Sequence, residues 1–501
     1  TKTLEQDTDA QRAATDLNRH TQALAEKQAA GKPPEDTPRH QPFTNASTPL
    51  TLTPPDRFSN GEARRDIPST IPCRPSMPRP ATAQLPAAAP RLAITGLGLI
   101  TPLGDAAWPT FRALLAGKTL EARAAACPAE ADPFTLAQAT GAVAGTAFAS
   151  VDPAVDLAEH AAREAADQAG IPLAHLPLYL GTSKGALQTL STHLGDPRYA
   201  KRSPAEPSPQ IAQRFPPHAN LERHLQRRLN LIPNRHTVAA CASSLVALHQ
   251  ARMDLLDPRR DEHQPAHALV LTVDAALSPA LLHSYRRLGV LAPLTPDQYH
   301  PRPLSTDPPG FVLAQTAAAV VLSRLPADAQ APPTPGTLSL DHTAIANDTH
   351  HLIHPAPSLP ALRHLAAQIL DQQQTQPEPP ITLLHPHAPG TPYHDAAELQ
   401  ALSETFRPQP EDGPKLPVYA AKGAIGHALG ASPLAALVLA ALMLKSGKRP
   451  PMPWLDRYAP RLTPGLDLCS APLSTPRRGS HAVFAAGFAG HNAAARISHH
   501  V

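Results

Sequence analysis

Cysteine is scarce in this sequence, with four residues in a chain of 501. So few thiols cannot form a disulfide scaffold for a chain of this length. No Cys-x-x-Cys pair and no Cys/His cluster has the spacing of a structural zinc site. The sequence therefore predicts a protein of the reducing cytoplasm, and no part of it indicates a metal ion or another cofactor.

A strong excess of either charge is also absent. The chain has 44 Lys and Arg against 41 Asp and Glu, which gives a formal net charge of +3. No run of basic residues marks a surface for nucleic acid. We therefore expect no nucleic-acid partner.

Long apolar runs are missing as well. The longest stretch, Leu434–Leu444, is well short of the ~20 residues that span a bilayer, so it predicts a buried helix. The beginning of the chain is polar and carries charges of both signs, which predicts no secretory signal. We expect no membrane span.

Proline, in contrast, is abundant, with 62 residues. Residues 1–90 combine proline with almost no periodic apolar pattern, which predicts a flexible N-terminal tail. From Arg91 onward, short apolar strands alternate with helices, a pattern typical of an α/β protein with mostly parallel buried sheets. Strand–turn–helix units recur on both sides of residue 330, so we predict two similar halves, 91–330 and 331–501.

The segment around Cys241 has the pattern of a nucleophile elbow. A predicted strand, His236–Ala240, leads into a turn of small residues, and a predicted helix, Leu245–Leu256, follows it. The start of a helix favours thiolate over thiol, and its free N–H groups can bind an oxyanion. Taken alone, however, a buried structural cysteine is the more common explanation.

His387 follows a short predicted strand, Ile381–Leu384, and precedes a turn with proline and glycine. The carboxyl ends of strands are where the sites of α/β proteins gather. A solvated loop histidine is the alternative, and His385 and His394 lie close by in the sequence.

A third segment contains Lys422 and His427. A predicted strand, Val418–Ala421, leads into Lys422, and Gly423 and Gly426 allow close approach of the backbone. The chain contains 10 Lys against 34 Arg. A lysine in an apolar setting therefore indicates a need for a point charge, with a solvated side chain as the alternative.

Near the end of the chain, a predicted strand, Ala482–Phe488, runs into a glycine-rich turn. Gly487 and Gly490 allow backbone N–H groups to approach a ligand. Phe488 either lines a pocket or packs in the core.

Together these segments resemble the β-ketoacyl-[acyl carrier protein] synthase family, the condensing enzymes of fatty-acid and polyketide synthesis. The resemblance extends from Arg91 to Val501. It rests on five segments in the family's order: RLAITGLGLITPLG, CASS, HAPGTPYHDAAE, KGAIGHALGAS and GFAGHNA.

The resemblance implies a thiolase-like fold, in which two similar α/β halves form duplicated αβαβα layers, usually in a homodimer. It also implies an acyl carrier protein bearing acyl and malonyl groups as the partner, and no cofactor.

The resemblance further implies a role for each motif residue. Cys241 would take an acyl group from a carrier thioester. His387 and His427 would stabilise the enolate that forms when the malonyl thioester loses carbon dioxide, and Lys422 would orient the site electrostatically. The N–H groups of Cys241 and Phe488 would form the oxyanion hole, with Phe488 as a gate. Two histidines favour the elongating type of synthase.

Several positions around these residues depart from the family pattern. In the histidine segment, Ala388 and Pro389 replace a Gly and a Thr, so Thr391 is left as the hydroxyl for phosphopantetheine. The other replacements are Ala314-Gln315-Thr316 for Gly-Glu-Gly, Ser305 and Pro308 for Asp and Arg, and Ala489 and His491 for Gly and Thr.

We therefore expect a divergent ketosynthase that condenses an acyl group on Cys241 with malonyl carrier protein, in a specialised polyketide or unusual fatty-acid pathway. One alternative is an acyltransferase or thioesterase on the same fold without condensation. Another is a non-catalytic partner like a chain-length factor, paired with a related subunit. Such partners usually lack the nucleophile.

Overall fold

The computed structural model describes residues 91–143, 152–189, 217–260, 264–296, 298–325, 335–375, 379–406 and 413–501. All of them lie in one compact unit, Thr82–Val501. The predicted tail, 1–90, lies outside the described residues.

Five strands of the first half form one side of a mixed sheet, in the order β3-β2-β4-β5-β1. β2 is parallel to β3 and β4, whereas β5 is antiparallel to β4 and β1. β5 alone therefore runs against the other four. The bounds are β1 (Arg91–Ile100), β2 (Pro177–Gly181), β3 (Ile232–Thr237), β4 (His267–Asp274) and β5 (Thr316–Leu325).

Four strands of the second half continue the sheet in the order β6-β13-β12-β7. β7 is parallel to β12, and β13 is antiparallel to its neighbours β12 and β6. Beyond β7, Leu384 pairs in parallel with Val418. The bounds are β6 (Leu338–Asn347), β7 (Ile381–His385), β12 (Gly479–Ala486) and β13 (His491–His499).

The two halves share one topology. We number the strands of each half in chain order and count the Val418 segment as the third strand of the second half. From the outer edge of the sheet to its centre, the order in both halves is then third, second, fourth, fifth, first. The pairing of Ala93 with Ser339 joins β1 to β6. The predicted duplicated α/β architecture is confirmed, with one strand in each half running against the rest.

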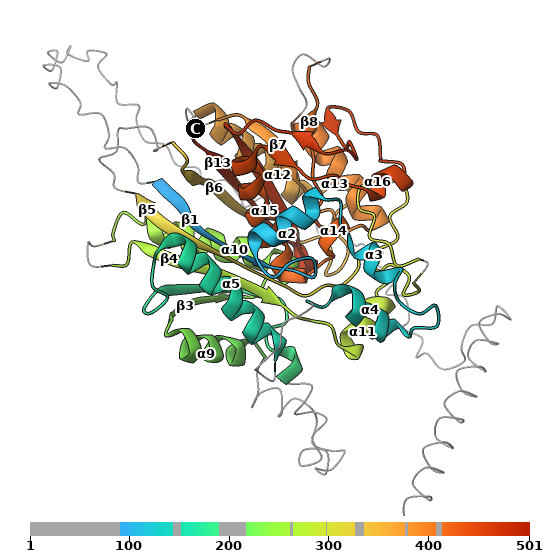
Figure 1. Ribbon diagram of the computed structural model, residues 1–501. Helices are drawn as coiled ribbons and strands as arrows, with labels where there is room; N and C mark the ends of the chain where they lie inside the picture. Colours follow the sequence, from blue (N-terminus) through green and yellow to red (C-terminus); the bar gives the residue numbers. More distant parts are fainter. Residues whose placement is uncertain are drawn as a thin grey trace, which may run out of the picture. The chain divides into compact units, whose positions relative to one another are not determined.

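Helices cover the sheet and fill the space between its halves (Figure 1). α10 and α15 contact strands of both halves and form the central layer. α5 and α9 cover the first half, whereas α12 covers the second and α13 packs on α12. Their bounds are α5 (Pro153–Ala169), α9 (Pro217–Leu229), α10 (Ser243–Leu256), α12 (Pro360–Thr375), α13 (Pro392–Thr405) and α15 (Ser432–Ser446).

α15 contains the apolar stretch that the sequence predicts as a buried helix. Its first turn holds Pro433, and Gly447 ends it in a left-handed conformation with φ of 68°. The stretch Leu429–Ser446 is long and apolar enough to cross a membrane, but 83% of it is buried inside the protein. Burial on all sides explains its uniform apolarity.

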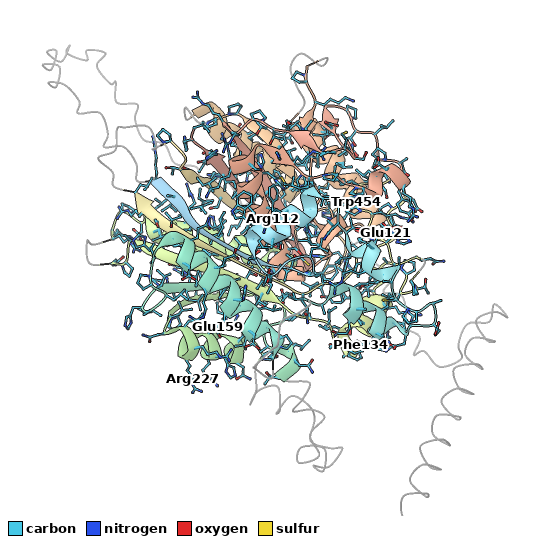
Figure 2. The ribbon with its side chains drawn as sticks, viewed as in Figure 1. Arg112, Glu121, Phe134, Glu159, Arg227 and Trp454 are labelled. Carbon is cyan, nitrogen blue, oxygen red and sulfur yellow. The ribbon has the colours of Figure 1, made fainter. Side chains whose placement is uncertain are left out.

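Short elements complete the fold around the site. Trp454 of α16 is buried, and its Nε1 donates to the carbonyl of Pro303 at 2.9 Å. Arg457 of the same helix pairs with Glu121 of α3, which ties α16 to α3. Figure 2 labels Trp454 of α16 and Glu121 of α3. The short elements are α2 (Ala107–Leu115), α3 (Leu120–Ala124), α4 (Pro133–Gly141), α11 (Pro279–Arg287), β8 (Leu416–Pro417), α14 (Lys422–Ile425), β9 (Lys448–Arg449), α16 (Trp454–Arg457), β10 (Leu466–Asp467) and β11 (Leu473–Ser474).

Candidate active site

Cys241 lies in a single 3-10 turn, η1 (Ala240–Ala242), directly before α10. β3 ends at Thr237, so the predicted strand stops before this turn. Ala240 has a left-handed φ of 48°. The hydroxyl of Ser243 accepts the N–H of Ala239 at 2.8 Å and donates to the carbonyl of Ala240 at 2.7 Å. These bonds close a tight turn that places Cys241 at the beginning of a helix.

The surroundings of Cys241 act against the thiolate that its place at the start of a helix is expected to favour. Burial raises the pKa of Cys241 to about 12, and the nearby Asp274 carboxylate also raises it. The ammonium groups of Lys422 and Lys184 act in the opposite direction. Desolvation therefore outweighs the favourable charges, and Cys241 is a thiol at neutral pH. Its activation needs a proton acceptor.

His387 lies two residues beyond the last residue of β7, His385, at the carboxyl end of that strand as predicted. Its N–H donates to one oxygen of Glu398 at 2.6 Å, and the N–H of Ala388 donates to the other at 2.7 Å. The Lys422 ammonium donates to the carbonyl of His387. Two buried charged side chains therefore fix the backbone on both sides of the imidazole.

Lys422 begins α14 and is 8% exposed. Burial lowers its pKa to about 8, while Glu398, Cys241 and Asp395 raise it. It therefore carries its charge at neutral pH, beneath the backbone of His387. The strand predicted before Lys422, Val418–Ala421, is represented only by the pairing of Val418 with Leu384. The regular strand in this region, β8, is Leu416–Pro417.

His427 follows α14, and its ring lies 5.6 Å from that of His387, nearly perpendicular at 78°. Its Nδ1 is 2.9 Å from the hydroxyl of Ser432. Burial, with a further contribution from Lys422, lowers the pKa of both histidines well below its ordinary value. Both imidazoles are therefore neutral at pH 7 and can each offer an N–H group or accept a proton.

The closing glycine-rich turn packs directly on the cysteine turn. β12 ends at Ala486, two residues before the end of the predicted strand. Phe488 lies beyond it in a 3-10 turn, η3 (Phe488–Gly490). A Cβ atom on Gly487 would lie 2.9 Å from the carbonyl of Ala239 and 3.0 Å from the nitrogen of Cys241. Only glycine allows this approach without a shift. Phe488 packs beside Cys241 in one apolar cluster.

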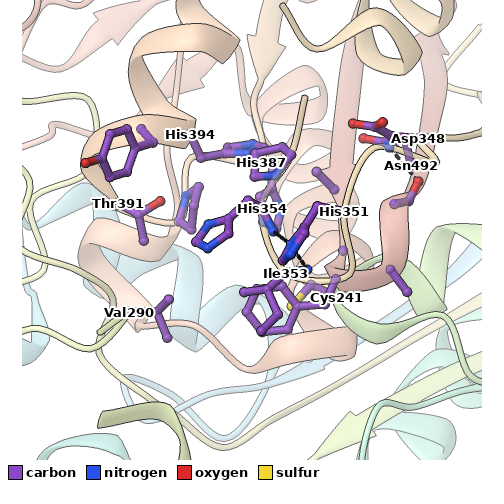
Figure 3. Close-up of a pocket in the computed structure, with 18 of the residues that line it drawn as sticks. Cys241, Val290, Asp348, His351, Ile353, His354, His387, Thr391, His394 and Asn492 are labelled. Atoms are coloured by element: carbon purple, nitrogen blue, oxygen red, sulfur yellow. Dashed lines mark hydrogen bonds between the residues drawn. The ribbon is translucent and has the colours of Figure 1, made fainter. Parts of the chain in front are cut away.

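A cavity of about 250 Å³ brings these residues together. Cys241, His387, His427, Phe488 and Thr391 all line it, and Figure 3 labels Cys241, His387 and Thr391 among them. Lys422 lies behind the wall, against the backbone of His387. The structure thus gathers all six sequence-predicted site residues in one region, while their roles stay predictions.

Several residues of the site were missed by sequence reasoning. Glu398 and Asp395 are fully buried on α13, and Asp395 accepts the N–H groups of Gly390 and Leu304 at 3.0 and 2.8 Å. Burial raises the pKa of Asp395 to about 6. The signal was the pair of acids in HDAAE, at the end of the histidine segment. Ser432, which orients His427, gave no comparable signal.

The departures from the family pattern have visible consequences. Ala388 and Ala489 stand at positions where the family has glycine, and both have left-handed φ angles, of 36° and 61°. Gln315, at the place of the family's carboxylate, accepts the N–H of Val143 at 3.2 Å. The backbone has thus kept the shape that glycine would suit, at a cost in strain.

Among the described residues, no group of three or more His, Cys, Asp or Glu side chains could hold a metal ion.

Comparison with known proteins places this geometry in a family. Residues 89–327 match the domain described as beta-ketoacyl synthase, N-terminal domain, and residues 339–456 match the beta-ketoacyl synthase, C-terminal domain. Erythronolide synthase EryA3 of Saccharopolyspora erythraea is 30% identical over 223 residues, 44% of this chain and 7% of its own length. Equisetin synthetase eqxS of Fusarium heterosporum is 30% identical over 290 residues, 53% of this chain and 7% of its own length. The chain thus corresponds to a small part of these long proteins.

Solved structures agree with the fold. A structure titled as a type II polyketide synthase acyl carrier protein in complex with its ketosynthase, AntDE:AntF, has a TM-score of 0.66 at 18% identity, covering 82% of this chain and 100% of that one. The ishigamide ketosynthase/chain length factor has a TM-score of 0.62 at 21% identity, covering 83% and 100%. At these identities the likeness shows a shared fold, the thiolase-like fold of ketosynthases. With both of its domains matched in sequence, this chain belongs to the β-ketoacyl synthase family.

Proposed function

We propose that this chain catalyses decarboxylative condensation of an acyl group held on Cys241 with malonyl carrier protein, in polyketide or fatty-acid biosynthesis. The convergence of Cys241, His387 and His427 on one cavity carries this proposal. A thiol and two neutral imidazoles are the groups that both halves of such a reaction need.

In the first half-reaction, the sulfur of Cys241 attacks the carbonyl carbon of an acyl thioester. The thiol proton passes to a neutral imidazole, because the raised pKa of Cys241 keeps it protonated at rest. The N–H groups of Cys241 and Phe488 would bind the oxyanion. The carrier's sulfur then leaves and takes up a proton, and the acyl group remains on Cys241.

In the second half-reaction, the malonyl thioester loses carbon dioxide, and the electrons of the broken C–C bond form an enolate. The N–H groups of His387 and His427 would stabilise its oxygen. The enolate carbon attacks the acyl carbonyl, a C–C bond forms and the sulfur of Cys241 leaves. Lys422 would hold His387 in place throughout.

The proposed partner is an acyl carrier protein, with the hydroxyl of Thr391 binding its phosphopantetheine arm. Thr391 lines the cavity at the start of α13. The solved neighbours titled as complexes with a carrier protein and with a chain length factor support this choice of partners. We propose a homodimer, or a heterodimer with a related subunit, in the cytoplasm.

A second candidate function is acyl transfer or thioester hydrolysis without condensation. It is favoured by the neutral Gln315 at the place of a family carboxylate. A chain-length-factor-like role is disfavoured by the presence of Cys241 at its turn.

The test uses the chain with acyl carrier protein and malonyl carrier protein labelled at the free carboxyl group. Ketosynthase activity predicts release of labelled carbon dioxide, a condensed product, and an acyl adduct on Cys241 in mass spectra. Cys241→Ala abolishes the adduct and the product, whereas Cys469→Ala, at an exposed cysteine, leaves both unchanged. Acyl transfer without carbon dioxide release would support the second candidate instead.

A further inference from the structure

A third imidazole, His394, adjoins the two histidines of the site. It lies in the first turn of α13, lines the cavity and is 8% exposed. Its ring is 5.1 Å from that of His387 and nearly perpendicular to it, at 81°. Since His387 also meets His427 at 5.6 Å, the three rings form a row with His387 in the middle, and Figure 3 labels two of its members, His394 and His387.

His394 has a buried nitrogen without a hydrogen-bond partner. Its Nε2 lies 3.5 Å from Oε2 of Glu398, a distance that suits an ion pair but is too long for a good hydrogen bond. Glu398 already accepts the backbone N–H of His387 with one oxygen and that of Ala388 with the other. A proton on His394 would therefore connect the row of imidazoles to the carboxylate that positions it.

Charged groups of both signs lie around His394. On its own helix, Asp395 and Glu398 are both fully buried carboxylates. From α14, Lys422 supplies one ammonium group. The positive N-terminal end of α13 opposes a proton on His394, but a carboxylate one turn away and within ion-pair distance acts more strongly.

We propose that His394 is the proton-bearing member of this row and acts as a positioning residue, which pairs with Glu398 and keeps His387 and His427 neutral. This inference rests on the proposed condensation, because neutral imidazoles are needed to donate to the enolate and to accept the proton of Cys241. Three imidazoles 5 to 6 Å apart do not all hold protons, and Glu398 selects which one does. The electrostatic influence of His394 lowers the pKa of both other histidines.

The remaining imidazoles near the cavity do not compete for this role. His351 and His354 line the same cavity from the segment before α12, with their rings stacked 5.1 Å apart. The Nδ1 of His351 accepts two backbone N–H groups, from Ile353 at 3.1 Å and His354 at 3.2 Å. No carboxylate is paired with either ring among the ion pairs of the described residues.

The direct test is NMR of the full chain with isotope-labelled histidine, titrated from pH 5 to 8. His394→Phe identifies the signals of His394 and keeps a ring in its place. His394→Gln keeps a polar side chain without a titrating group, in case the Phe variant does not fold. We expect His394 to lose its proton within this range while His387 and His427 stay neutral throughout. A signal of His387 or His427 that stays protonated to a higher pH than that of His394 would overturn the proposal.

The second readout is the pH profile of carbon dioxide release from malonyl carrier protein. In both variants the proton affinity of His387 rises by about tenfold. The decline of carbon dioxide release in acid therefore begins about one pH unit higher than in the wild-type chain. His350→Asn, at an exposed side chain outside the cavity, leaves the profile unchanged. An equal loss at every pH would mean that His394 only fills space, and would overturn the proposal. If the wild-type chain releases no carbon dioxide, the proposed function fails, while the NMR titration still decides the role of His394.

Discussion

The carboxylate of Glu398 holds the backbone of His387 at 2.6 Å, although eleven residues separate them in the sequence. One side chain of α13 thereby sets where an imidazole from the end of β7 points. The opposite face of the same residue is held by Lys422. The position of His387 thus depends on two buried charges, and not on loop sterics alone.

Glu398→Gln replaces one of two accepting oxygens with an N–H₂ group that faces a backbone N–H. Charge-assisted hydrogen bonds to buried groups are worth about 1.5–3 kcal/mol, so we expect at least a tenfold loss of condensation rate. Single-turnover kinetics measure it. Glu404→Gln, in a half-exposed ion pair on the same helix, is the matched control and retains activity. Equal condensation rates in the two variants would show that Glu398 does not contribute to catalysis by positioning His387.

Gly487→Ala brings a Cβ atom against the cysteine turn, 2.9 Å from the carbonyl of Ala239. Because that contact is with rigid backbone, the turn must shift, and we expect acylation of Cys241 to slow at least tenfold. Mass spectrometry of the acyl adduct over time measures this rate. Gly170→Ala is the control: its φ of 66° strains the backbone too, but nothing lies near, so it lowers stability without slowing acylation.

The raised pKa of Cys241 predicts slow and strongly pH-dependent alkylation. With a pKa of about 12, the thiolate fraction grows about tenfold per pH unit from pH 7 to 9. Iodoacetamide labelling followed by mass spectrometry gives the rate for this residue. Lys422→Met removes the charge that lowers this pKa, so labelling becomes slower still. A rate that levels off below pH 9 would show an activated thiolate instead.

Ala388 and Ala489 occupy left-handed backbone, where a Cβ atom costs about 1 kcal/mol. Ala388→Gly and Ala489→Gly each relieve this strain, and we expect an unfolding free energy that is unchanged or higher by up to about 1 kcal/mol. Ala396→Gly, inside α13, lowers it by about 1 kcal/mol. Urea unfolding distinguishes the signs. Similar losses of unfolding free energy in all three variants would show that the backbone is not strained at Ala388 and Ala489.

A buried histidine pair makes stability fall in acid. Nε2 of His385 and Nδ1 of His481 are 3.2 Å apart, on neighbouring strands of the sheet. Burial lowers the pKa of His385 to about 3 and that of His481 well below its ordinary value. Below about pH 6.5 these two histidines bind protons in the unfolded chain but stay neutral in the folded chain. Each of them therefore lowers the unfolding free energy by about 1.4 kcal/mol for every pH unit of acidification. His481→Leu reduces this slope by about one group's share between pH 6 and 4. An unchanged slope would mean that His481 is protonated in the folded chain.

The sequence predicted the class of fold and the segments of the site because each rests on local patterns. The cysteine turn, the end of β7 and the turn after β12 were all visible as strands that run into small residues. What remained hidden was long-range. Glu398 reads as an ordinary helical acid until the fold buries it beneath His387, and the pKa of Cys241 depends on desolvation that no local pattern reports. The helix-start argument for a thiolate leaves this desolvation out.

β13 comes last along the chain, yet it lies between β6 and β12 inside the sheet. Its pairing with β12 holds the turn between these two strands, which carries Phe488, and the N–H of Gly487 donates to the carbonyl of His491 at the start of β13 at 2.7 Å. The proposed site therefore depends on a strand inserted between distant segments as much as on the local turn of Cys241.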